Sequence, residues 1–194
     1  MKISTREIAG TAVFAALVVV FDYALKYSNL KLPFPWNTDL KFDFTGVPIV
    51  SAFLIFGLIP GALTSIIASV AIAARSGNVI GASMKGLAEF STILGMAVGM
   101  KIVSKFKGAT MFAFGILLRV LVMVAANFLL VYVGVLSFRT YAEIPVIYAL
   151  LLGAFNAIAG IICISLGYLI YEAVKRRARA LLAKAKDETK ETAR

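Results

Sequence analysis

The sequence predicts an all-α integral membrane protein, a bundle of six transmembrane helices with both chain ends in the cytoplasm. The 194 residues are 61% hydrophobic and only 15% charged, whereas about a quarter of the residues of a soluble domain are charged. A globule of this size cannot bury so much apolar surface. Six apolar runs separated by prolines, glycines and charges provide the spans.

The spans follow from the apolar runs in chain order. They are expected at residues 8–25, 47–58, 59–74, 87–103, 109–136 and 146–171. The segment 26–46 is polar and aromatic, and Pro33 and Pro35 exclude a continuous helix there. The turn GLIPG joins the second and third spans in a helical hairpin. The polar patch 75–86 and the connector SFRTYAE separate later spans.

The C-terminal residues form a separate region. Residues 172–194 are charge-rich and are predicted to be a cytoplasmic helical tail, so the membrane domain covers residues 1–171. Thirteen of the 20 Lys and Arg residues fall on the predicted cytoplasmic side and six on the other, and Arg119 lies within a span. The net charge of +10 therefore indicates membrane orientation and not nucleic-acid binding.

Composition also excludes most enzyme chemistry. The chain has no His and one Cys, Cys163, so it can form neither a His-dependent catalytic pair nor a zinc site nor an internal disulfide. It contains no GxxxxGK[ST] phosphate loop and no evident pair of catalytic carboxylates. We therefore expect a protein that is not an enzyme and has no cofactor.

Four polar residues at membrane depth are the candidates for function, because each is costly there unless it is paired or hydrated. Asn127 and Asn156 offer amide donors and acceptors that suit the edge of a planar heterocycle, or they hydrogen-bond neighbouring helices. Glu89 and Arg119 either contribute to a site or form an ion pair between helices.

Small residues at helical spacing predict close helix contacts. Gly95 and Gly99 form GxxxG, and the sixth span carries Ala149, Gly153 and Ala157; packing within the bundle explains both. Ala12 and Ala16, with Ala15 beside them, form an AxxxA face that meets either this bundle or another subunit.

Four segments resemble the substrate-binding S components of energy-coupling factor (ECF) transporters, and most closely their riboflavin-specific group. LKFDFTGVPIVSAFLIFGLIPGAL at 40–63 resembles the first loop with the second and third helices, and GLAEF at 86–90 resembles the entry to the fourth. RVLVMVAANF at 119–128 and GAFNAIAG at 153–160 resemble motifs of the fifth and sixth helices.

The resemblance implies a six-helix subunit in the cell membrane. It binds a vitamin near the outer face and assembles with a transmembrane coupling subunit and two ATPases. The helix face carrying Ala12, Ala15 and Ala16 resembles the one that meets the coupling subunit. The segment 26–46 resembles a lid over the ligand, and Asn127 and Asn156 match residues that hydrogen-bond the flavin ring.

The expected pocket combines an aromatic lid, convergent amides and a carboxylate. Its predicted ligand-binding residues are Trp36, Lys41, Phe42, Asp43, Glu89, Asn127 and Asn156, and its predicted ligand is riboflavin. Two departures from the riboflavin group concern the substrate: Ala159 replaces a common lysine and Glu89 replaces a usual asparagine. Alternatives are an S component for thiamine, a pterin or a deazapurine, and a stand-alone secondary transporter.

Overall fold

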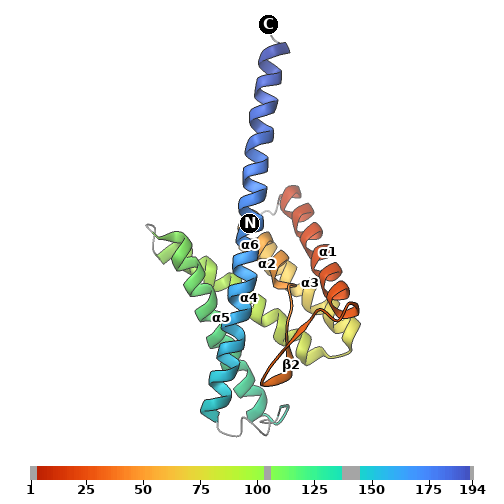
Figure 1. Cartoon of the computed structure of the whole chain (residues 1–194), viewed down its shortest axis with the longest axis vertical. Coiled ribbons are helices and arrows are strands. Elements are labelled where there is room, and N and C mark those ends of the chain that lie inside the picture. The colour runs from red at the N-terminus through yellow and green to blue at the C-terminus, as the bar shows by residue number, and fades with distance from the viewer. Residues whose placement is uncertain (1–3, 103–105, 137–144, 193–194) are drawn as a thin grey trace.

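The computed structural model describes residues 4–102, 106–136 and 145–192. Within them the chain forms six α-helices and one two-stranded antiparallel hairpin (Figure 1). In chain order these are α1 (Thr5–Tyr27), β1 (Leu32–Phe34), β2 (Asn37–Phe42), α2 (Gly46–Phe56), α3 (Leu58–Ser76), α4 (Val79–Ile102), α5 (Lys107–Tyr132) and α6 (Pro145–Thr192).

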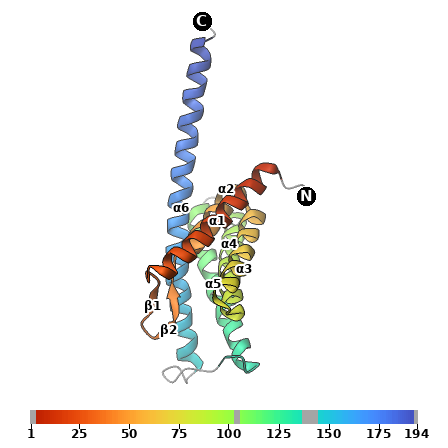
Figure 2. The same cartoon turned by 90° about the vertical axis from the view of Figure 1, so that its right-hand side faces the viewer.

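Consecutive helices run in opposite directions, so the bundle has two distinct ends (Figures 1 and 2). The hairpin β1–β2 lies at one end, which we call the hairpin end. The start of α1 and the C-terminal part of α6 lie toward the other, which we call the tail end. The two described chain ends therefore share a side, as an even number of spans requires.

Local sequence explains where the helices begin and end. Ser4 and Glu7 form a capping box at the start of α1, in which the Glu7 N–H donates to Ser4 Oγ at 3.2 Å. Gly57 separates α2 from α3 and has a φ of 99°. A residue with a Cβ rarely adopts that conformation, which explains why a glycine stands at this turn. The tight turn predicted at GLIPG is confirmed.

The core lies between α2, α4 and the middle of α5 and α6. Its fully buried side chains include Ile49, Val50, Ile93, Met96 and Ile164. The α4–α5 contact depends on the GxxxG pair: a Cβ on Gly95 would strike the Phe114 carbonyl, and one on Gly99 would strike the Thr110 carbonyl. The predicted packing role of this pair within the bundle is confirmed.

The outer surface of the bundle suits lipid. Among the described helices, α1, α3, α5 and α6 are long and apolar enough to cross a membrane, whereas α2 is a shorter apolar helix. Large apolar side chains point outward from several of them, including Val70, Leu121 and Leu150. The chain is therefore an all-α membrane bundle of six helices, as the sequence predicts.

Two details differ from the prediction. The polar patch 75–86 is not a loop throughout, because α4 already begins at Val79. The segment 26–46 contains the β1–β2 hairpin, whose strands the sequence did not predict. Residues 172–192 of the predicted helical tail continue the sixth span as one helix, because α6 runs from Pro145 to Thr192, and its last part projects beyond the bundle (Figure 2). The connector SFRTYAE lies outside the described residues.

Candidate functional site

A cavity of about 810 Å³ opens at the hairpin end. The hairpin, the start of α4, the end of α5 and the start of α6 contribute its walls. Its lining residues are Asn37, Thr38, Leu40, Lys41, Asn78, Ile80, Gly81, Met84, Lys85, Ala88, Met123, Asn127, Val135, Leu136, Tyr148, Leu152, Phe155 and Asn156. Cavities that hold small organic ligands have volumes of roughly 300–1,000 Å³.

Two buried asparagines line the cavity from facing helices. Asn127 on α5 donates from Nδ2 to the Met123 carbonyl at 2.8 Å, and its Oδ1 accepts a bond from Tyr148 Oη at 3.4 Å. Asn156 on α6 donates from Nδ2 to the Leu152 carbonyl at 3.0 Å. Its side chain is 1% exposed, and its Oδ1 has no hydrogen-bond partner among the described residues. An unpaired buried acceptor is costly, so this cavity wall favours a ligand that brings a donor.

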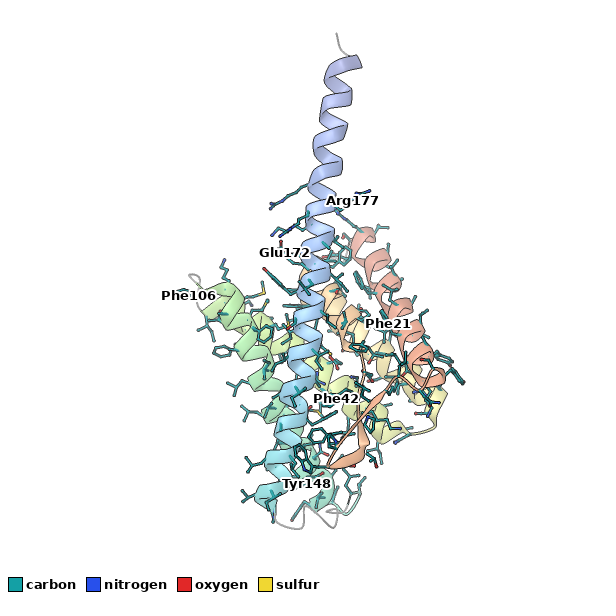
Figure 3. The ribbon with its side chains drawn as sticks, in the orientation of Figure 1. Phe21, Phe42, Phe106, Tyr148, Glu172 and Arg177 are labelled. Carbon is teal, nitrogen blue, oxygen red and sulfur yellow. The ribbon has the colours of Figure 1, made fainter. Side chains whose placement is uncertain are left out.

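Aromatic packing holds the hairpin over one side of the cavity. Phe34 is 2% exposed, and its ring centroid lies 5.4 Å from that of Phe155 and 5.8 Å from that of Phe42. Phe42 also packs on Phe155, with centroids 4.8 Å apart. Figure 3 shows Phe42 and Tyr148 in the half of the bundle that carries the hairpin end. Because Phe155 lines the cavity, the hairpin is attached directly to the cavity wall.

Ion pairs connect the hairpin segment to the bundle core. Asp43, which follows β2, accepts a hydrogen bond from Lys85 Nζ on α4 at 2.8 Å. The same Nζ lies 2.9 Å from Glu89 Oε1, and Arg119 Nη1 on α5 lies 3.2 Å from that oxygen. Arg119 also donates to Thr92 Oγ1 at 3.0 Å. For Glu89 and Arg119 the sequence predicted either a role in a site or an ion pair between helices. The structure contains the ion pair, and both side chains are almost completely buried.

A second group of ion pairs lies next to the first. Asp22 on α1 accepts a hydrogen bond from Lys31 at 2.6 Å and is bound by Arg75 on α3. Lys31 Nζ also lies 3.7 Å from Asp43 Oδ2, which joins the two groups. These partners lie 9 and 53 residues from Asp22 in the chain, so the sequence did not predict the pairing.

The environment of Asp43 keeps its carboxyl group ionised. Burial alone would raise the pKa, but the charge of Lys85 and the hydrogen bonds from Lys85 and Thr45 outweigh it and lower the pKa from 3.8 to about 2. Asp43 therefore remains an anion that can hold the hairpin segment at any physiological pH.

The predicted ligand-binding residues fall into two sets. Lys41, Asn127 and Asn156 line the cavity. The other four are not among its lining residues. The aromatic residues Trp36 and Phe42 belong to the packing of the hairpin. The carboxylates of Asp43 and Glu89 hold Lys85, which does line the cavity. Lys85 was missed because its neighbours in sequence are those of a polar loop.

The small-residue face of α1 divides in the structure. Ala12 and Ala16 are exposed on the outer surface, whereas Ala15 is 5% exposed and packs into the bundle. Only the first two are available to another subunit, and Ala15 belongs to internal packing.

These features define a helical membrane bundle with a covered cavity at one end and an exposed alanine face on its first helix. The chain is similar to a solved structure of the S component of a bacterial ECF transporter, with a TM-score of 0.73 and 19% sequence identity over 89% of this chain and 97% of that one. It therefore has the fold of that S component. No protein-family profile and no curated protein matches the sequence.

Proposed function

We propose that this chain is the substrate-binding S component of an ECF-type transporter in the cell membrane, and that its ligand is riboflavin. The observation that carries the proposal is the buried Oδ1 of Asn156, an acceptor without a partner among the described residues, in a cavity wall that also carries Asn127. The resemblance of both asparagine motifs to those of the riboflavin group supports the same ligand.

The chemistry of the cavity suits a flavin. The imide edge of the flavin ring has one N–H donor between two carbonyl acceptors, and an asparagine oxygen is a complementary acceptor for that donor. Phe155 and Tyr148 provide aromatic surface for a flat ring. Asn37, Thr38 and Asn78 offer polar groups to a hydroxylated side chain at the more exposed part of the cavity.

The energy for uptake comes, in this proposal, from other subunits. The sequence contains no phosphate-binding loop of the type GxxxxGK[ST]. The resemblance to S components implies that two ATPases act through a transmembrane coupling subunit. The exposed face of Ala12 and Ala16 is the proposed contact with that subunit, because small side chains let two helices approach closely.

The direct test is to identify the small molecule that copurifies with the full-length protein from its native membrane. A yellow flavin with the mass of riboflavin is the expected result. A colourless thiamine, pterin or deazapurine would contradict riboflavin while keeping the S-component assignment. Uptake by the isolated chain in vesicles that contain no ATPase would contradict the S-component assignment.

A further inference from the structure

Positive charge gathers directly after the last apolar stretch of α6. Residues 172–179 contain one carboxylate, Glu172, and four cations, which are Lys175, Arg176, Arg177 and Arg179. Residues 180–194 contain four cations and three carboxylates. The net charge is therefore +3 in the first segment and +1 in the second, so the excess lies in the two turns that leave the bundle.

The side chains that precede this charge indicate its depth in the membrane. Leu169 is 63% exposed on the outer surface of α6, and the ring centroids of Tyr168 and Tyr171 lie 6.1 Å apart. Tyrosines are typical of the boundary between hydrocarbon and water. The helix follows the long axis of the bundle (Figure 1), so Arg176 and Arg177 lie roughly 8–9 Å beyond Tyr171. The headgroup layer is roughly 5–8 Å thick, and a long side chain can bend back into it.

Arg176, Arg177 and Arg179, which we call the arginine cluster, are exposed and have no ion-pair partner among the side chains that the structure describes. Glu172 does not neutralise them, because its Oε1 lies 3.3 Å from Lys175 Nζ. Successive residues of a helix point about 100° apart, so these four cations cover roughly 200° of its circumference. A folded partner protein would contact one face of the helix, whereas lipid headgroups surround it.

Other helices bring further exposed cations to the tail end. These are Arg6 in the first turn of α1, Lys101 in the last turn of α4 and Lys107 at the start of α5. Figure 3 shows Phe106, next to the start of α5, and Arg177 toward the end of the bundle opposite Tyr148. Glu7, a carboxylate at this end, is held in the capping box of α1. In the described part of the chain, four helices therefore expose positive charge at one level of the bundle.

We infer that the tail end binds the headgroups of anionic phospholipids and that the arginine cluster is the principal contact. A guanidinium group can donate two parallel hydrogen bonds to a phosphate, and each Lys or Arg near an anionic membrane surface strengthens binding roughly fivefold. Membrane orientation requires only an excess of cations on one side. Here the cations also lie at headgroup depth and are unpaired among the described side chains. The site is separate from the ligand cavity at the hairpin end, so it does not depend on the proposed function.

Native mass spectrometry of the full-length protein tests the inference. The protein is held in detergent with equal amounts of dioleoyl-phosphatidylglycerol and dioleoyl-phosphatidylcholine, which share their acyl chains and differ in headgroup charge. We expect the wild type to retain the anionic lipid about tenfold more strongly, and this preference to fall as the salt concentration rises. The triple variant Arg176→Gln/Arg177→Gln/Arg179→Gln should reduce the preference to less than about threefold. The matched triple variant with Lys at the same three positions should keep it, and so should Lys26→Gln at the hairpin end of α1.

Each outcome bears on one part of the inference. Equal retention of the two lipids by the wild type, or a preference that salt does not change, would overturn it without any variant. A full preference in the glutamine variant would overturn the assignment of the arginine cluster, and loss of copurifying ATPases in that variant would then assign the cluster to a protein contact. Loss of the preference in the lysine variant would overturn binding by charge. Thermal unfolding followed by Trp36 emission checks that the variants are folded, and we expect no change because the three arginines are exposed.

Discussion

The carboxylate of Asp43 accepts a hydrogen bond from Lys85 Nζ at 2.8 Å, and this contact joins the segment after the hairpin to α4 beside the cavity. Removing the charge with Asp43→Asn should loosen the hairpin and cost about 1–3 kcal/mol of stability. The emission of Trp36, the one tryptophan of the chain, reports the change because its ring packs edge-on against Phe34 at 5.1 Å. Glu172→Gln, which removes a tail carboxylate, is the control.

The same contact predicts an acid limit for the hairpin. The folded-state pKa of Asp43 is lowered from 3.8 to about 2, so its stabilisation is fully present above pH 3.8 and is lost as the pH falls through about 2. Trp36 emission should therefore stay constant down to pH 4 and change below it, and this acid step should disappear in Asp43→Asn. A midpoint at or above pH 4 would show that Lys85 does not stabilise the carboxylate.

The buried pair of Glu89 and Arg119 predicts a large loss of stability when one partner is removed. Glu89→Gln leaves Arg119, which is 2% exposed, without its counter-charge, and we expect a loss of about 3–5 kcal/mol in unfolding measurements in detergent. The double variant Glu89→Gln/Arg119→Met should lose less than the sum of the single variants. In the control Glu172→Gln, loss of the partly exposed pair with Lys175 should change stability by about 1 kcal/mol or less. A Glu89→Gln protein as stable as the control would contradict the importance of the pair.

The α4–α5 contact predicts that a single methyl group is damaging at one glycine and harmless at another. Gly95→Ala places a Cβ against the Phe114 carbonyl and should cost about 1–3 kcal/mol. Gly153→Ala is the matched control, since its Cβ would meet only Val120 Cγ1 at 3.6 Å, an ordinary contact. Equal melting temperatures for the two variants would show that the close contact of α4 with α5 at Gly95 does not contribute to stability.

The alanine face of α1 predicts a separation between assembly and ligand binding. Ala12→Leu and Ala16→Leu alter an exposed surface, so they should preserve riboflavin affinity and block copurification with the coupling subunit and ATPases. Ala15→Leu enlarges a buried side chain and should instead destabilise the chain itself by about 1–3 kcal/mol. Complexes that still form with both exposed variants would exclude this face as the contact.

The apolar runs of the sequence were sufficient to predict the first three helices. The spans at 8–25, 47–58 and 59–74 correspond to α1, α2 and α3 within a few residues, because lipid and core both select apolar side chains. The two asparagines of the cavity were also found from sequence, since a lone amide in an apolar span is conspicuous.

The start of α4 and the ion pairs could not be predicted in the same way. Lys85 and its neighbours resemble a polar loop, and Lys85 is largely buried in a helix because Asp43, 42 residues earlier, and Glu89 both pair with it. Asp22 and Arg75 are separated by 53 residues, and their contact depends on how α1 packs against α3. The strands of the hairpin depend on Phe34 packing against Phe155, a contact that local propensity does not contain.

The most direct test of the account is a riboflavin titration, followed by flavin fluorescence, of the wild-type protein and of Asn156→Ala and Asn127→Ala. We predict saturable quenching at micromolar riboflavin for the wild type and a loss of about 1–3 kcal/mol of binding energy in each variant, because each substitution leaves a polar ligand edge unpaired. The absence of saturable quenching in the wild type would contradict riboflavin as the ligand. Unchanged affinity in both variants would show that the asparagines serve only helix packing.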